Sequence, residues 1–182
     1  MGMGETVEEQ IQRREYSRVD AYIPFDYRIV ADDEKGHIQA RISGDTATSE
    51  FRPIDNIGDY DYIFGEWLKI LNAKLDTVIR LMTLQREGYF GLPFKTINIS
   101  GGGMSFSLTE AIALGEILEI KLMLTWNQPV AMSVYGEVTK SEKQHDGYFT
   151  AVRYVHMDSS VRDEIIRFVF EREREIIRQK RR

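Results

Sequence analysis

The sequence predicts a mainly β protein with added helices, organised as one domain. Short runs in which apolar and polar residues alternate occur at 22–30 and 37–43 and recur from 97 to 154, which is typical of half-buried strands. Residues 60–85 instead place apolar residues at steps of four and three, which is typical of a helix. Because no helical pattern separates the later strands, we expect an antiparallel barrel or sandwich.

The composition restricts the kind of protein. The chain has 182 residues, 42% of them hydrophobic, which is enough for one core and an extension. It has no cysteine, which excludes disulfides and zinc–thiolate sites and suits a reducing cytoplasm. No run of about 18 apolar residues is present, so we expect no membrane span. With a net charge of −5, nucleic acid is not an expected partner.

The first strand is expected over residues 22–30, and Pro24 near its start indicates an edge strand. A weaker alternation predicts a second strand at 37–43, after a turn at Gly36. Turns at Gly115, 127–129 and 146–147 separate most of the later runs. These runs predict strands at 97–99, 104–108, 118–126, 130–134 and 148–154.

The helix expected over about 60–85, within an insertion at 58–87, has a regular apolar seam. The seam consists of Phe64, Leu68, Leu71, Leu75, Val78 and Met82. Ile63, Trp67, Ile70 and Leu81 widen it along one flank. The helix could lie on its own domain, but a 3/4 spacing with a widened stripe favours a coiled coil with another subunit. We therefore expect a homo-oligomer through this helix, as a dimer or a tetramer.

A second helix is expected at the C-terminus, from about residue 159 onward. Ser159 or Ser160 can cap it, and Asp163 and Glu164 would lie in its positive first turn. Its last turns are highly charged and are expected to project into solvent. Its buried face is predicted to consist of Val161, Ile165, Phe168 and Val169.

The sequence offers little to support an enzyme. Its three histidines, at positions 37, 145 and 156, lack the spacing of metal ligands. The glycine run at 101–103 lacks the Gly-Lys-Ser/Thr that completes a phosphate loop. No nucleophile is recognisable beside a base. We therefore expect a protein without catalytic residues, metal or cofactor.

A binding function has better support. Arg13, Arg14 and Arg18 precede the first strand, and arginine presents a planar fork that can hold a phosphate or the O6/N7 edge of guanine. Further on, Asn98 and Ser100 lie on the same side of a predicted strand, followed by Gly101–Gly103. Glycines there would let a ligand approach the main chain or allow a positive φ. Taken singly, the arginines could be a solvated cluster and the glycines a hairpin turn.

Together these residues resemble the signature of PilZ domains, bacterial receptors for the second messenger cyclic di-GMP. Arg14-x-x-x-Arg18 followed by Asn98-x-Ser100-x-x-Gly103 carries the resemblance. It implies a six-stranded antiparallel β-barrel with a C-terminal helix. It also implies that the arginines hold guanine edges and phosphates, that Asn98, Ser100 and Gly103 meet a guanine, and that Arg13 adds a stacking or phosphate contact.

On this basis residues 1–182 form one PilZ-like domain. We expect a flexible arm with the arginines at 1–21, the inserted heptad helix at 58–87, and the rest of the barrel with the closing helix at 88–182. The insertion departs from the usual short connection and is similar to an oligomeric subgroup of the family. We expect a non-enzymatic cytoplasmic receptor that acts on an unidentified downstream protein. The alternative is a ligand-independent oligomeric scaffold that works through the helix.

Overall fold

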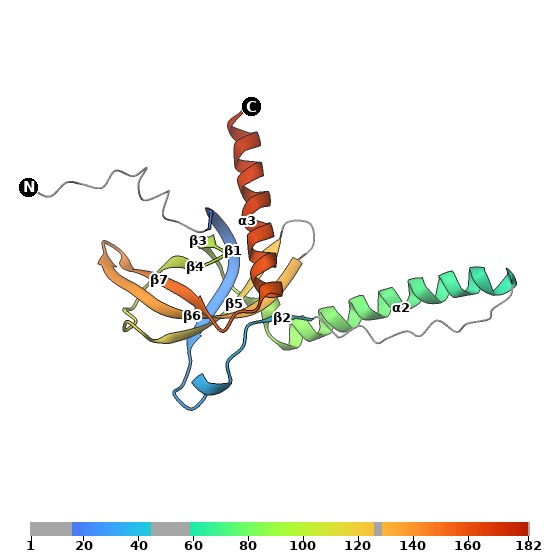
Figure 1. The fold of residues 1–182 in the computed structure, drawn as a ribbon, viewed down its shortest axis with the longest axis horizontal. Helices are drawn as coiled ribbons and strands as arrows, with labels where there is room; N and C mark the ends of the chain where they lie inside the picture. The colour runs from blue at the N-terminus through green and yellow to red at the C-terminus, as the bar shows by residue number, and fades with distance from the viewer. Residues whose placement is uncertain (1–15, 45–58, 126–128, 182) are drawn as a thin grey trace, which may run out of the picture.

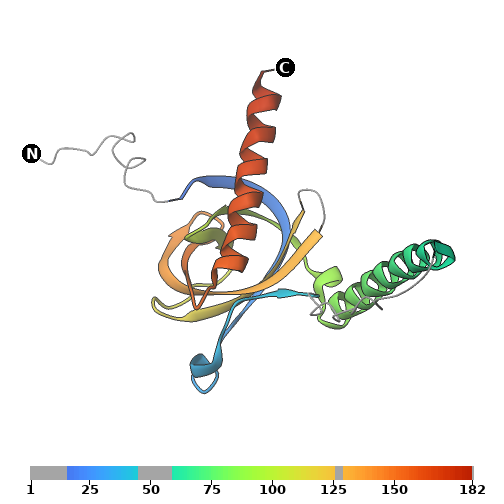
Figure 2. The ribbon, with the colours of Figure 1, turned by 45° about the vertical axis from the view of Figure 1, so that its right-hand side comes forward.

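The computed structural model describes residues 16–44, 59–125 and 129–181, and these form a β-barrel with two long helices (Figures 1 and 2). The strands are β1 (Arg18–Ile29), β2 (Arg41–Ser43), β3 (Phe94–Ser100), β4 (Gly103–Leu108), β5 (Ile117–Thr125), β6 (Pro129–Gln144) and β7 (Gly147–Val155). The helices are α2 (Asp59–Arg86) and α3 (Ser159–Lys180), with short 3₁₀ turns η1 (Lys35–His37) and η2 (Tyr89–Gly91).

The barrel is antiparallel throughout and closes on itself. Its strands follow the order β6-β5-β1-β3-β4-β7, and the pairing of β7 with β6 completes the ring. The short β2 is an extra strand that pairs with β6 beside β7. The prediction of a mainly β fold with a six-stranded antiparallel barrel is therefore confirmed.

Pro24 does not mark an edge strand, which corrects the expectation from sequence. β1 pairs with β3 through residues 18–24 and with β5 through residues 25–29, so the strand has a neighbour on each side, although each half of it pairs on one side only. Pro24 is the last residue of the β3 ladder, and the next backbone N–H, that of Phe25, donates to the Pro93 carbonyl at 3.0 Å. Proline has no N–H to lose, so it suits the point where β1 changes partner.

The second strand is also shorter than predicted. Only Arg41–Ser43 pair with β6, because the chain forms the 3₁₀ turn η1 where a strand was expected to begin. Ala40, just before β2, is buried in the barrel core. The alternating pattern therefore identified a core contact correctly but placed too many residues in the strand.

The core fills the barrel and continues under α3. Phe25, Leu118, Ile120, Leu122 and Leu124 are fully buried. The buried face of α3 is the predicted one, and it joins the same core; its residues are Val161, Ile165, Phe168 and Val169. The last turns of α3 extend away from the barrel, as expected (Figure 1).

The start of α3 differs from the prediction by one residue. Asp158, not Ser159 or Ser160, is the N-cap, and its carboxylate accepts a hydrogen bond from the Val161 N–H at 3.0 Å. This bond, with that from the Ser160 hydroxyl, lowers the pKa of Asp158. The first turn carries no acidic residue, so Asp163 lies beyond the turn that was expected to contain it.

The helix α2 is attached to the barrel at its C-terminal end. Leu84 and Tyr89 are buried against Met123 and Ala131, and the Tyr89 hydroxyl lies 2.7 Å from the Ser43 Oγ. The Lys121 Nζ donates to the Glu87 carbonyl just past the helix at 3.1 Å, which satisfies one of its terminal carbonyls. The rest of the helix runs out into solvent (Figures 1 and 2).

The predicted seam of α2 is not covered by the chain's own barrel. Its six residues are 37–64% exposed, and they are Phe64, Leu68, Leu71, Leu75, Val78 and Met82. The flanking residues Ile63, Trp67, Ile70 and Leu81 are exposed as well. The interpretation that the stripe packs on its own domain is therefore wrong for residues 63–82.

We predict that the free energy of unfolding falls as the pH rises above about 10, because buried tyrosines resist ionisation. Burial raises the pKa of Tyr89 to about 12 and also raises the pKa of Tyr154. The pKa of a tyrosine in the unfolded chain is about 10. Between these values the unfolded chain releases protons that the folded chain keeps. Denaturant titrations at several alkaline pH values should show a shallower fall for Tyr89→Phe. If the unfolding free energy of that variant fell with pH as steeply as that of the parent, Tyr89 would not be a cause of the alkaline loss of stability.

Candidate functional site

The motif residues come together at the β3–β4 hairpin and the start of β1. Arg18 is the first residue of β1 and pairs with Ser100 at the end of β3. Ser100 in turn pairs with Gly103 at the start of β4, across a two-residue turn at 101–102. Directly paired residues point to the same face of a sheet, so these three residues form one row on the outer face of the barrel. Arg18 thus belongs to the barrel and not to the arm expected over 1–21.

Arg18 is the cation of this row. Its side chain is exposed, and it makes no hydrogen bond or ion pair with any other residue in the described part of the chain. The two other arginines of the predicted site, Arg13 and Arg14, lie outside the described residues. The structure therefore places one of the three predicted arginines, and that one is available to an anionic ligand.

Ser100 organises the turn. It is only 2% exposed, and its hydroxyl donates to the Gly103 carbonyl at 3.0 Å and accepts from the Gly102 N–H at 3.4 Å. Asn98 lies two residues earlier on the same face and is half-buried, and its side-chain amide donates to Asp20 of β1 at 2.8 Å. Both polar side chains of the motif hold the hairpin and β1 in position.

The glycines of the hairpin are needed because protein groups come close to them. None of Gly101–Gly103 has a positive φ, so that part of the expectation is wrong. A Cβ on Gly103 would lie 2.2 Å from the Val152 carbonyl oxygen of β7. A Cβ on Gly101 would lie 2.7 Å from the Tyr16 ring. Gly103 therefore permits the close pairing of β4 with β7, whether or not a ligand is bound.

Tyr16 covers the glycine turn. Its ring lies against Gly101 and Gly102, and its hydroxyl accepts a hydrogen bond from the Arg162 Nη1 of α3 at 3.0 Å. The next residue, Ser17, donates to the carboxylate of Glu173, also on α3. The segment between the two motif arginines is thus joined to α3.

These residues line a groove of about 380 Å³ on the barrel surface. Arg18, Ser100, Gly102 and Gly103 form one part of it, with Tyr16 at its side. The groove continues over β4, β7 and β6, where it is lined by Met104, Thr139, Ala151, Val152 and Arg153. Its volume falls within the range of small-molecule sites, which is about 300–1,000 Å³.

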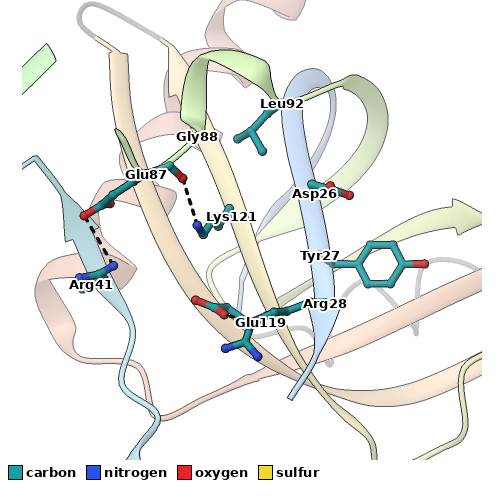
Figure 3. Close-up of a pocket in the computed structure, with 9 residues that line it drawn as sticks. All are labelled: Asp26, Tyr27, Arg28, Arg41, Glu87, Gly88, Leu92, Glu119 and Lys121. Carbon is teal, nitrogen blue, oxygen red and sulfur yellow. Dashed lines mark hydrogen bonds and ion pairs between the residues drawn. The ribbon is translucent and has the colours of Figure 1, made fainter. Parts of the chain in front are cut away.

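A larger groove, of about 490 Å³, lies elsewhere, at the base of α2 (Figure 3). Its basic side chains already have partners: Arg28 donates to Glu34 at 2.6 Å and to Glu119 at 2.5 Å, and Arg41 lies 3.7 Å from Glu87. Lys121 donates to the end of α2, as described above.

Glu119, an acidic residue of the same groove, is also held by internal partners. Its burial disfavours the charged form, but hydrogen bonds from Ser133 and Arg28 outweigh that effect and lower the pKa of the carboxyl. A ligand would have to displace these internal ion pairs, so the larger groove joins α2 to the barrel and is the weaker candidate for a binding site.

Sequence reasoning missed three residues of the groove region, Tyr16, Arg153 and Arg162. Tyr16 stands between the motif arginines, but nothing in the sequence shows that its ring meets the glycines. Arg153 can be assigned to the outer face of its strand from alternation, yet its position beside Gly103 depends on the pairing of β4 with β7. Only register information could have found it.

The described residues offer neither a metal site nor a membrane span. No group of histidine and acidic side chains there is arranged to hold a metal ion. Among the same residues, no helix has the length and apolar character needed to cross a membrane.

Comparison with known proteins identifies the family. A model of the PilZ domain matches residues 73–171, more than half of the chain, and the chain therefore belongs to the PilZ domain family. This family comprises receptors and adaptors for cyclic di-GMP. The matched region includes Asn98, Ser100 and Gly103, whereas the three arginines lie before it. No match was found among curated proteins.

Solved structures that are similar to this one include the following two. One is a tetrameric PilZ domain from Xanthomonas campestris, described as self-assembled via an unusual helical bundle. It is 16% identical, the match covers 90% of this chain and 91% of that one, and the TM-score is 0.58. The other is the inhibitor of motility MotI/DgrA of Bacillus subtilis, which is 13% identical over 90% of this chain and 53% of that one, with a TM-score of 0.49. At such identities the first likeness supports the fold alone.

We predict that Gly103→Ala destabilises the protein, because its new methyl group would overlap the Val152 carbonyl and push β4 from β7. The expected loss is about 1–3 kcal/mol of unfolding free energy, as for other overpacked sites. Gly36→Ala is the matched control, since a Cβ at that position would meet no atom within 4 Å. Thermal melts compare the two. Equal melting temperatures for both variants and the parent would show that β7 has room for a side chain.

Proposed function

We propose that this chain is a non-enzymatic receptor for cyclic di-GMP. The observation that carries the proposal is the row Arg18–Ser100–Gly103, in which a guanidinium that has no partner among the described residues stands beside a floor of small residues in a groove. Arginine forks bind phosphates and guanine edges, and cyclic di-GMP presents both. Arg13 and Arg14 would close over the ligand from the segment before β1, while Ser100 and Gly103 would form the base of the site, with Asn98 beside them.

The contacts of Tyr16 and Ser17 suggest how binding changes the surface. These two residues lie between Arg14 and Arg18 and are bonded to Arg162 and Glu173 of α3. A ligand that draws the arginines onto the hairpin would act on these bonds, so α3 and the adjacent barrel face would differ between free and bound protein. A downstream protein partner would read that difference. The lack of cysteine suits a cytoplasmic location for such a receptor.

We also propose that the protein is a homo-oligomer held by α2, and that it is a tetramer. A dimeric coiled coil buries one seam per helix. Here Ile63, Trp67 and Ile70 form a second exposed row beside Phe64, Leu68 and Leu71, so the outer half of the helix can contact two neighbours. The tetrameric helical bundle described for the Xanthomonas campestris protein supports this arrangement. A scaffold that needs no ligand is the alternative function for the same surface.

The first test is calorimetric titration with cyclic di-GMP. The parent should bind, and Arg18→Ala should lose roughly ten- to a hundredfold in affinity, the equivalent of about 1.5–3 kcal/mol for a charge-assisted contact. Because Arg18 is exposed, its removal should leave the melting temperature of the free protein nearly unchanged. Arg86→Ala, an exposed arginine at the end of α2, is the control. The absence of heat with the parent at tens of micromolar ligand would leave the scaffold as the better interpretation.

The second test concerns assembly. Leu71→Asp with Leu75→Asp would place charges in the centre of the proposed interface and should give monomers. Trp67→Glu with Ile70→Glu removes only the second row and should give dimers. Ala73→Asp, on the exposed face opposite the seam, should keep the parent's size. Light scattering reports each mass. A monomeric parent at tens of micromolar protein would refute the tetramer.

A further inference from the structure

The row of motif residues extends one strand beyond the motif. Gly103 of β4 pairs with Arg153 of β7, just as Ser100 pairs with Gly103 and Arg18 with Ser100. Paired residues share a face, so Arg153 stands on the same outer surface as Arg18. Neighbouring strands lie about 4.8 Å apart, which puts the two arginine backbones about 14 Å apart along the sheet. Between them lie only the small residues Ser100 and Gly103.

Arg153 and Arg18 also line the same groove. Both side chains are exposed, and they are the two basic residues among those that line it. The groove therefore has a cation at each end and a floor of small residues between them. A ligand with one anionic or acceptor-rich group would need only one of these cations, whereas a cyclic dinucleotide carries two phosphates and two guanines.

Unlike Arg18, Arg153 has a counter-ion among the described residues. Its Nη2 lies 2.6 Å from the Glu137 Oε2, and Glu137 of β6 is its partner in the strand register. The arginine side chain of this pair is 67% exposed, and ion pairs so open to water contribute little to stability. A ligand phosphate can therefore replace Glu137 at small cost, and Glu137 keeps the guanidinium near the groove until then.

We propose that Arg153 is a ligand-binding residue outside the recognised motif. It holds the end of cyclic di-GMP opposite Arg18 through its guanidinium fork, and Glu137 is a competing counter-ion in the free protein. This inference rests on the proposed function. It assigns opposite roles to the two members of one ion pair, one favouring the ligand and the other opposing it.

The experiment is calorimetric titration of cyclic di-GMP into Arg153→Ala, Glu137→Gln, Arg153→Lys and the double variant Arg153→Ala/Glu137→Gln. We expect Arg153→Ala to weaken binding at least tenfold and Glu137→Gln to strengthen it severalfold, since the amide cannot neutralise the arginine. Arg153→Lys should recover only part of the affinity, because lysine lacks the planar fork. The double variant should bind like Arg153→Ala. Arg174→Ala, on the exposed part of α3, is the control.

The outcomes separate this inference from the proposed function. If the parent and Glu137→Gln bind, Arg18→Ala shows its expected loss of affinity, and Arg153→Ala binds like the parent, the receptor stands and the role of Arg153 is refuted. If Arg153→Ala and Glu137→Gln weaken binding equally, the pair acts only by supporting the barrel and the inference is again refuted. If the parent does not bind, both fall together. Melting temperatures near the parent's value verify that the variants are folded.

Discussion

The register of the β3–β4 hairpin is the constraint on which the candidate site depends. Side chains alternate between the two faces of a strand, so a slip of one residue would turn every motif side chain into the barrel. The two-residue turn fixes Ser100 opposite Gly103, the Ser100 hydroxyl closes that turn, and Gly103 lets β7 approach. Because Arg18 pairs with Ser100 and Arg153 pairs with Gly103, this register also places the two arginines at the two ends of the row.

Different residues of one row serve the fold and supply most of the proposed affinity. Ser100 is buried and bonded within the turn, and Gly103 is required by the Val152 carbonyl. The hairpin needs these two residues in order to adopt its conformation. The floor of small residues in the groove is a consequence of that need. The cations that would supply most of the affinity are exposed and make little contribution to the fold. Stability and the proposed ligand affinity would thus depend on neighbouring residues of the row.

The elements of the fold could be predicted from sequence because periodicity is local. The stripe of α2, the buried face of α3 and the existence of the strands all follow from spacing within a short window. Pairing is not local. The partner change at Pro24 and the position of Arg153 beside Gly103 depend on strands far apart in the chain.

Two smaller errors have equally physical causes. Asp158, Ser159 and Ser160 are all good caps, so the sequence does not decide between them, and the hydrogen bond to Val161 does. The strand β6 runs ten residues further than predicted, to Gln144, and five of its last six residues are exposed where it forms a hairpin with β7. Without a buried face, alternation gives no signal.

The two long helices lie at different positions on the barrel, which separates the proposed assembly surface on α2 from the arginine row beside α3. α2 leaves the barrel on the side of β2, β5 and β6 (Figures 1 and 2). The arginine row lies on β1, β3, β4 and β7, next to Tyr16 and Ser17, which contact α3. An oligomer built on α2 would leave the row open in each subunit. A ligand in the row would touch α3 through Tyr16 but reach α2 only through the closed barrel. In the proposed oligomer, assembly would be the same with and without ligand, and the ligand-dependent change would appear at α3 of each subunit.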